Sequence, residues 1–244
     1  MTDDETIVGY YGKIPSKGDF ITKLLPRSFT DPWDTWLREV IAHTKSELGE
    51  NWMEYYLTTP IYHYALSSGL CGNPVWLGVM MPSVDSVGRY FPMTICKSFS
   101  VTSNPLSLIE KNKQWLVKAE DLLLSCLDEN FSQSEFDKQL SLLASEESNE
   151  STITLKKSSM NRYQDSAWNF PVHENENLAV VYPELVNSML KTFYSSFSVW
   201  HTSGSDQINS GFVITEGFPP QKSMTAFMDG QWEKRGWSDE QIIR

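Results

Sequence analysis

Cysteine is scarce in this chain of 244 residues. It occurs three times, at Cys71, Cys96 and Cys126, an odd number without short paired spacing. That pattern argues against a disulfide framework and against a zinc site. The four histidines are scattered, and none falls at the His-x-x-x-His or His-Glu-x-x-His spacing of metal sites. We therefore expect reduced, buried thiols and no bound metal.

Basic residues are also in short supply. Twenty Lys and Arg stand against 31 Asp and Glu, which gives a formal net charge of −11. Nucleic acids and anionic membrane surfaces are bound through basic patches, so neither is expected as a partner. The excess of acidic residues is unevenly distributed along the chain, because residues 101–150 hold 4 Lys and Arg against 10 Asp and Glu. This excess is either a solvated helix face or a surface that meets a basic patch of a partner.

Long uninterrupted apolar segments are missing too. Residues 55–84 contain no Asp, Glu, Lys or Arg, but prolines and glycines interrupt them and Ser and Thr are frequent. The segment is typical of buried strands joined by a turn, not of a membrane span. The chain begins Met-Thr-Asp-Asp-Glu, with three acidic residues among the first five, unlike the basic start of a secretory signal. We expect a cytoplasmic protein with no membrane insertion.

Motifs for nucleotide binding and hydrolysis are lacking as well. Gly9-Tyr-Tyr-Gly12-Lys13 has two residues between its glycines, whereas a phosphate-binding loop needs four, followed by Lys and Ser or Thr. The Gly-x-Ser-x-Gly turn of hydrolases does not occur. The sequence predicts no cofactor.

What the chain does contain is alternating strand and helix patterns. Asp31 as N-cap, Pro32 at the first helical position and a following apolar stripe predict a helix from residue 31. The apolar runs predict strands over Ile7–Tyr11, Ile61–Leu66, Val75–Met81, Phe91–Phe99, Phe197–Trp200 and Phe212–Thr215. Helical spacing predicts further helices over Trp52–Leu57, Pro105–Leu127, Phe136–Leu143, Pro183–Tyr194 and Pro219–Met228. This mixture favours a layered α/β domain, with a polar, Ser-rich surface loop over 145–166.

One cluster of polar residues has chemical interest. Ser83, Asp85 and Arg89 share a turn between two apolar strands, and Asp19 lies in another turn beside the first strand. The planar guanidinium of Arg89 can pair with either carboxylate. Either these groups satisfy turn amides and fix the loops, or the loops together present a surface for a partner.

Three motifs, in order, resemble the TagF (ImpM) family. They are Gly9-Tyr-Tyr-Gly-Lys-Ile-Pro-Ser-Lys-Gly-Asp-Phe20, Trp33-Asp-Thr-Trp-Leu37 and the stretch from Gly69 through Pro92, with Val-Gly-Arg-Tyr-Phe-Pro at its end. The resemblance is strongest over residues 7–100, whereas 101–180 match little. His201 stands where the family often has a second Trp, and Ser86 where a basic residue is common.

The resemblance implies a single domain over residues 1–244, folded as a three-layer α/β sandwich with a central mixed or antiparallel sheet. It implies a non-enzymatic, post-translational negative regulator of the bacterial type VI secretion system. The implied partner is the forkhead-associated scaffold protein of the apparatus. Within the matching motifs, the candidate interaction or scaffold residues are Lys13, Pro15, Gly18, Asp19, Phe20, Ser83, Asp85, Gly88, Arg89 and Tyr90.

Two other functions remain open at this point. The first is a hydrolase that uses the Ser83, Asp85 and Arg89 loop, which a deep polar pocket with a nearby histidine would favour. The second is a structural accessory subunit of the secretion apparatus.

Overall fold

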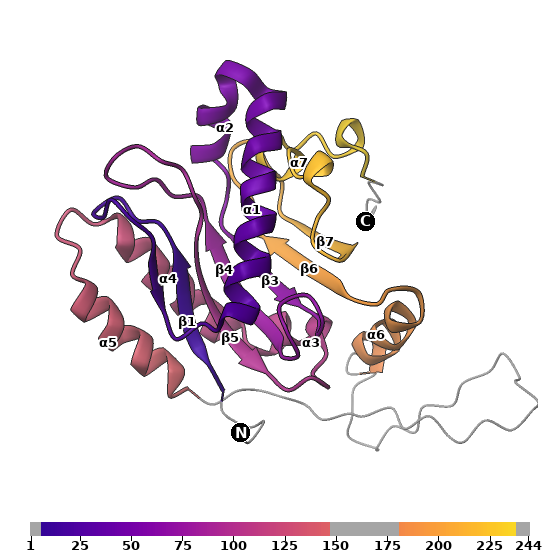
Figure 1. Ribbon diagram of the computed structural model, residues 1–244. Helices are drawn as coiled ribbons and strands as arrows, with labels where there is room; N and C mark the ends of the chain where they lie inside the picture. The colour runs from indigo at the N-terminus through magenta and orange to yellow at the C-terminus, as the bar shows by residue number, and fades with distance from the viewer. Residues whose placement is uncertain (1–5, 147–180, 238–244) are drawn as a thin grey trace, which may run out of the picture.

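A computed structural model describes residues 6–146 and 181–237. Its centre is a seven-stranded sheet in the order β2-β1-β5-β4-β3-β6-β7, in which every neighbouring pair is antiparallel. Helix α1 covers one face, and α3, α4 and α5 cover the other (Figure 1). The expected three-layer α/β sandwich is confirmed, with the antiparallel form of the sheet.

Six of the seven strands agree with the predicted apolar runs to within about two residues, and the short strand β2 was not predicted. They are β1 Val8–Gly12, β2 Ile21–Lys23, β3 Tyr62–Leu66, β4 Val75–Met81, β5 Met93–Phe99, β6 Phe197–Thr202 and β7 Gly211–Glu216. The helices are α1 Arg27–Leu48, α2 Trp52–Leu57, α3 Pro105–Lys111, α4 Lys113–Leu124, α5 Gln133–Ala144, α6 Val181–Phe193 and α7 Ala226–Asp229.

The central strand β4 shows why the sheet needs helices on both faces. All seven of its residues are buried. Val75, Leu77 and Val79 pack into the apolar cluster under α3, α4 and α5, while Trp76 and Met80 pack into the cluster under α1. Successive side chains of a strand point to opposite faces, so an apolar run with no polar alternation requires cover on both sides.

The core beneath α1 is mainly aromatic. The Trp33 ring stacks on Trp200 with centroids 6.2 Å apart and lies 4.8 Å from the Tyr64 ring. Tyr64 in turn covers Gly78, where a Cβ would lie 2.6 Å from the ring. The glycine is thus needed for close approach, because any side chain at position 78 would displace an aromatic ring.

Three of the predicted helices have wrong boundaries. Helix α1 begins at Arg27, with Pro32 inside it, and not at residue 31. The earlier start buries Phe29 against Trp33 and Trp76, at 5.5 and 4.7 Å between ring centroids, and this apolar contact outweighs the capping preference of Asp31.

The second wrong boundary concerns the helix predicted over Pro105–Leu127. It is broken at the buried residue Asn112 into α3 and α4, and a short 3₁₀ turn, Ser125–Leu127, ends it. The Asn112 side chain donates to Leu108 O at 2.9 Å, a local bond that competes with helical continuation. The helix predicted over Pro219–Met228 is reduced to a 3₁₀ turn, Gln221–Ser223, and the single turn α7.

Other expectations from the sequence have mixed outcomes. Cys71, Cys96 and Cys126 are free and buried. The surface loop expected over 145–166 lies outside the described residues from residue 147 onward. No helix within residues 6–146 and 181–237 has the length and apolar character needed to cross a membrane.

A histidine pair joins β3 to β6 on the face covered by α3 and α4. His63 and His201 are cross-strand partners with ring centroids 5.8 Å apart, and His63 Nε2 lies 2.8 Å from Glu120 Oε2. Burial lowers the pKa of His201, and the charges of His63 and Lys113 lower it further, while Glu110 opposes them. His201 Nδ1 is buried with no hydrogen bond to any described residue.

A lowered folded-state pKa makes protonation of His201 destabilising. The unfolded chain takes up the proton near pH 6.5, before the folded chain does, so stability is lost as the pH falls below that value. We expect the melting temperature of the natural protein to fall more between about pH 8 and about pH 5.5 than that of His201→Phe. Parallel pH profiles for the two proteins would contradict this.

Candidate functional site

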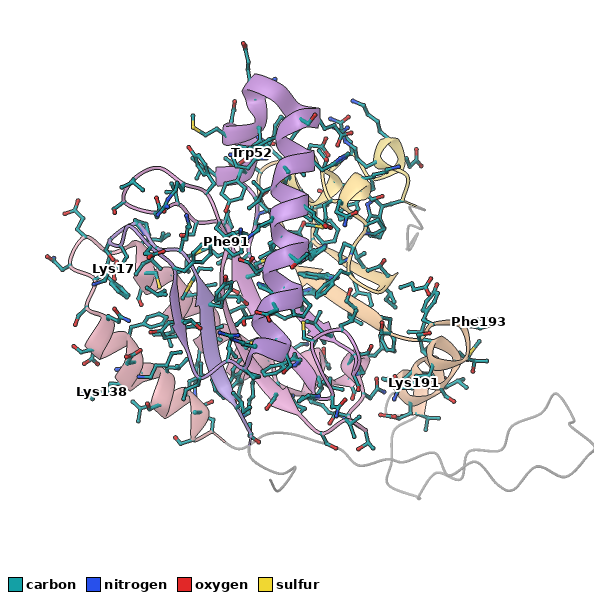
Figure 2. All side chains as sticks on the ribbon, in the orientation of Figure 1. Lys17, Trp52, Phe91, Lys138, Lys191 and Phe193 are labelled. Carbon is teal, nitrogen blue, oxygen red and sulfur yellow. The ribbon has the colours of Figure 1, made fainter. Side chains whose placement is uncertain are left out.

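The two loops predicted to carry the site lie at the same end of the sheet. Residues 13–20 connect β1 to β2, and residues 82–92 connect β4 to β5. Because β1 runs antiparallel to β5, with Tyr11 paired to Thr94, the end of β1 lies beside the start of β5. Gly12, with φ of 144°, permits this approach, since a Cβ there would lie 2.2 Å from Pro92 O. Figure 2 shows Lys17 and Phe91 on these neighbouring loops.

Asp85 is the centre of the site. Its carboxylate is buried and accepts four hydrogen bonds. Oδ2 receives Lys13 Nζ and Arg89 Nε, each at 2.8 Å, and Oδ1 receives the backbone amides of Val87 at 3.1 Å and Arg89 at 2.8 Å. One carboxylate therefore closes its own turn and ties that turn to the end of β1.

The charge of Asp85 is fixed by its surroundings. Burial by itself raises the pKa of this carboxyl, but the hydrogen bonds from Lys13 and from the amide and side chain of Arg89 outweigh it. The pKa is held well below its usual range. Lys13 is itself buried, with its ammonium 4.9 Å from the centre of the Phe20 ring. Asp85 is thus an ionised structural anion at all ordinary pH values and is not poised to act as a proton acceptor.

Arg89 joins the two loops from the outside. Its guanidinium donates to Gly18 O as well as to Asp85, and Ser86 N donates to Lys17 O at 2.9 Å. Of the two carboxylates that the sequence offered to Arg89, the structure selects Asp85. Asp19 instead accepts from the amide of Phe20 at 2.8 Å and stays exposed.

Aromatic residues support the turn from beneath. Tyr56 Oη donates to Ser83 O at 3.0 Å and accepts from Ser83 N at 3.1 Å. The Tyr90 ring meets Trp52 and Tyr56 edge-on, with centroids 5.1 and 5.5 Å away. These contacts connect the loop to α2, so the turn is held from both sides.

The remaining predicted residues shape the backbone. Gly88 has φ of 79°, and its amide donates to Asp85 O at 3.0 Å, closing the turn. Pro15 is half-buried in a turn closed by Lys17 N and Ile14 O at 3.2 Å. The Phe20 ring packs on Phe91, with centroids 4.8 Å apart. All ten predicted residues therefore lie in or beneath these two loops.

The arrangement does not favour the hydrolase alternative. Ser83 Oγ is buried and has no hydrogen-bond partner among the described residues, so no base there activates it. Asp85 is already occupied by two cations. Within residues 6–146 and 181–237, no group of three His, Cys, Asp or Glu side chains could hold a metal ion.

Sequence reasoning missed the specific role of Lys13. It considered this lysine as part of a phosphate loop, rejected that function and did not pair it with Asp85. The available signal was its position directly after a buried strand, where an ammonium needs a counter-charge nearby.

The comparison with known families bears directly on these loops. The model of the TagF N-terminal domain, described as type VI secretion system-associated, matches residues 9–143, more than half of the chain. The chain belongs to the TagF family. Both loops and helices α4 and α5 up to residue 143 lie within the matched part, so the secretion-associated domain of this chain includes the Lys13–Asp85 pair.

A solved structure extends the similarity beyond that domain. The crystal structure of PA0076 from Pseudomonas aeruginosa PAO1, at 2.05 Å resolution, is 29% identical in sequence. The match covers 97% of each chain with a TM-score of 0.72. No curated protein matches the chain.

Proposed function

We propose that this TagF-family protein is a cytoplasmic negative regulator of type VI secretion. It acts after translation by binding the forkhead-associated scaffold protein of the apparatus and performs no chemistry. The observation that carries the proposal is the saturated state of Asp85, because a carboxylate held by two cations and two amides supports a surface and does not catalyse. Membership of the TagF family is the basis for naming type VI secretion as the process in which that surface acts.

The outer surface of the two loops is the candidate contact face. It presents Lys17, Asp19, Val87 and Arg89, all exposed, above the buried pair of Lys13 and Asp85. The Val87 side chain is 66% exposed on the turn that Asp85 closes, an apolar group among charges. Such a combination is typical of a protein-binding surface, where a few apolar groups dominate affinity and charges determine specificity.

A protein that acts by occupancy should give a smooth dose response. With free regulator at about ten times its dissociation constant, roughly 90% of the partner is bound. We expect excess protein to suppress secretion and deletion to raise it, with no change in the amounts of apparatus proteins. Secreted-substrate level against regulator dose measures this. Unchanged secretion across a wide dose range in an active strain would refute repression.

Val87→Asp tests the contact face without touching the buried pair. We expect binding to the forkhead-associated protein to weaken about tenfold or more, with the melting temperature unchanged, because an apolar contact is replaced by a charge. The matched control is Val101→Asp, which is 54% exposed at the opposite end of β5. It should bind and repress normally.

Arg89→Ala provides the complementary measurement. Because its Nε bonds Asp85 and its guanidinium bonds Gly18 O, stability and binding should fall together. If Val87→Asp and Val101→Asp bind alike, the loops are not the contact face. Stoichiometric co-purification with the assembled apparatus, together with loss of secretion on deletion, would instead indicate a structural subunit.

A further inference from the structure

A groove runs along the outside of the helical hairpin formed by α4 and α5. Its volume is about 510 Å³, and it shares no residue with the loops around Asp85. The hairpin lies on the opposite face of the sheet from α1 (Figure 1). Its inner side is already used, because Leu116, Ala119, Leu123 and Leu140 are buried in the core and do not line the groove. The groove is therefore a second surface, separate from the one proposed above.

The floor of the groove is apolar and open to solvent. Leu122 and Phe131 are half-buried there, and the Leu142 side chain is 56% exposed. Each of the 12-residue helices α4 and α5 is about 18 Å long. A ligand that fills the groove is thus about three helical turns in length.

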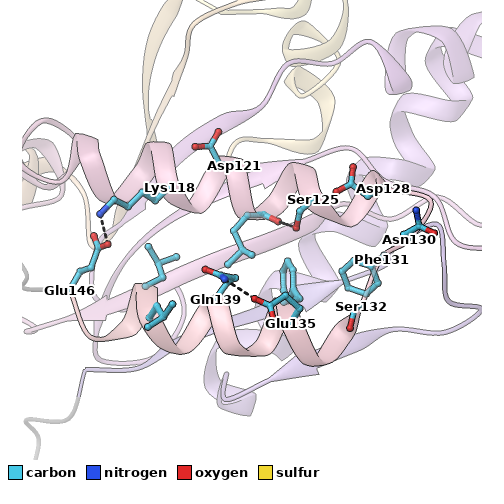
Figure 3. A pocket seen from close by; sticks show the side chains of 14 residues that line it. Lys118, Asp121, Ser125, Asp128, Asn130, Phe131, Ser132, Glu135, Gln139 and Glu146 are labelled. Atoms are coloured by element: carbon cyan, nitrogen blue, oxygen red, sulfur yellow. Dashed lines mark hydrogen bonds and ion pairs between the residues drawn. The ribbon is translucent and has the colours of Figure 1, made fainter.

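The rim of the groove is acidic. Four carboxylates line it, those of Asp121, Asp128, Glu135 and Glu146, and one cation, Lys118, which pairs with Glu146 (Figure 3). Lys138, which does not line the groove, lies 3.7 Å from Glu135 Oε2. No cation within residues 6–146 and 181–237 pairs with Asp121 or Asp128. The carboxylates of Asp121 and Asp128, which lack such a cation, therefore favour a ligand that brings positive charge to this side of the groove.

We propose that this groove binds a basic amphipathic helix of a partner protein. Apolar side chains of that helix, spaced at i, i+3 or i+4 and i+7, fill the floor over Leu122, Phe131 and Leu142. Its Lys and Arg side chains meet Asp121 and Asp128 on one side and Glu135 on the other. This is the helix-in-groove mode of recognition, in which the apolar face supplies affinity and the charges supply orientation and specificity.

The test uses a fluorescein-labelled peptide of about 14 residues with leucines along one helix face and lysines on both sides of them. A second peptide has the same composition in an order that scatters the leucines around the helix. Fluorescence anisotropy with the full chain should show binding of the first peptide, weakened by added salt, and little binding of the second. Equal binding of both peptides would reveal only general attraction to an acidic protein and would overturn the proposal.

Three variants locate the binding. Asp121→Lys with Asp128→Lys should weaken the peptide about tenfold, and Leu142→Ser should weaken it by a similar factor through loss of the floor. The control, Glu50→Lys with Glu54→Lys, makes the same change in net charge at exposed positions near α2 and should bind normally. Melting temperatures confirm that each variant is folded. Equal affinity of all three variants would overturn the groove as the site.

Two other occupants are separate outcomes. Residues 151–163 contain Lys156, Lys157 and Arg162 and no acidic residue. If a peptide of these residues binds more tightly than the probe, and the Asp121 and Asp128 substitutions abolish that binding, the groove belongs to the chain itself and a separate partner is refuted. A concentration-dependent dimer that disappears in Leu142→Ser would refute it in favour of a second copy.

Discussion

Lys13→Met should lower the melting temperature on the order of 5–10 °C, although a flexible chain of similar length fills the space. The substitution removes one of the two cations that compensate the buried carboxylate of Asp85 and leaves Arg89 as its remaining ionic partner. Removing one member of a buried ion pair is costly, because the other charge stays desolvated. Thermal unfolding near neutral pH measures the effect.

The double variant Lys13→Met with Asp85→Asn measures whether the two side chains are energetically coupled. Because it removes the uncompensated charge, it should be less destabilised than the sum of the two single variants. The lowered pKa of Asp85 adds a pH dependence: its contribution is present above the unfolded value of 3.8 and is lost as the pH falls below it. The gap between natural and Lys13→Met proteins should therefore narrow below about pH 4. A strictly additive double variant would show that the pair is not coupled.

Trp33→Ala should be at least as damaging, with a loss of about 3–5 kcal/mol of unfolding free energy and about 10 °C or more in melting temperature. Trp33 is fully buried and meets the rings of Phe29, Trp36, Tyr64 and Trp200, so its removal leaves a cavity among aromatic side chains that cannot collapse. Denaturant unfolding gives the free energy directly.

Two further substitutions serve as controls for Trp33→Ala. Trp33→Phe should cost much less, because it keeps an aromatic ring and removes the indole Nε1, which is buried without a hydrogen-bond partner among the described residues. Phe193→Ala on α6, where the ring is 74% exposed and projects outward (Figure 2), should be nearly neutral. Similar losses for Trp33→Ala and Phe193→Ala would contradict the central role of Trp33.

The strands were the most predictable part of the fold. Val75–Met81 is continuous, apolar and bounded by turn residues, and it forms β4 with the predicted limits. A strand that is buried on both faces is apolar along its whole length, so its ends are clear in the sequence. The helix boundaries were less predictable. The start of α1 at Arg27 depends on the contact of Phe29 with the distant Trp76, which local capping rules do not contain. The break at Asn112 follows from a local side-chain bond to Leu108 O, which the spacing of apolar residues does not reveal.

The candidate site was predictable in its parts but not in its pairing. The sequence placed Asp85 and Arg89 in one turn and Asp19 in another, and left both carboxylates as partners for Arg89. Which carboxylate is buried depends on how β1 lies beside β5, a long-range register that brings Lys13 to Asp85. The lysine was visible in the sequence, whereas its counter-charge, 72 residues away, was not.

The two loops are already ordered in the free protein, and this affects the rates at which a partner binds and leaves this surface. The two loops are joined by Asp85, Arg89 and the bond from Ser86 to Lys17 in the free protein, so little backbone entropy remains to be lost on association. Binding then requires no slow rearrangement of these loops. Among variants that keep the bonds between the two loops, differences in affinity should therefore appear mainly as differences in residence time. Variants that break these bonds should instead slow association, because the binding-competent conformation of the loops becomes a minority of the population.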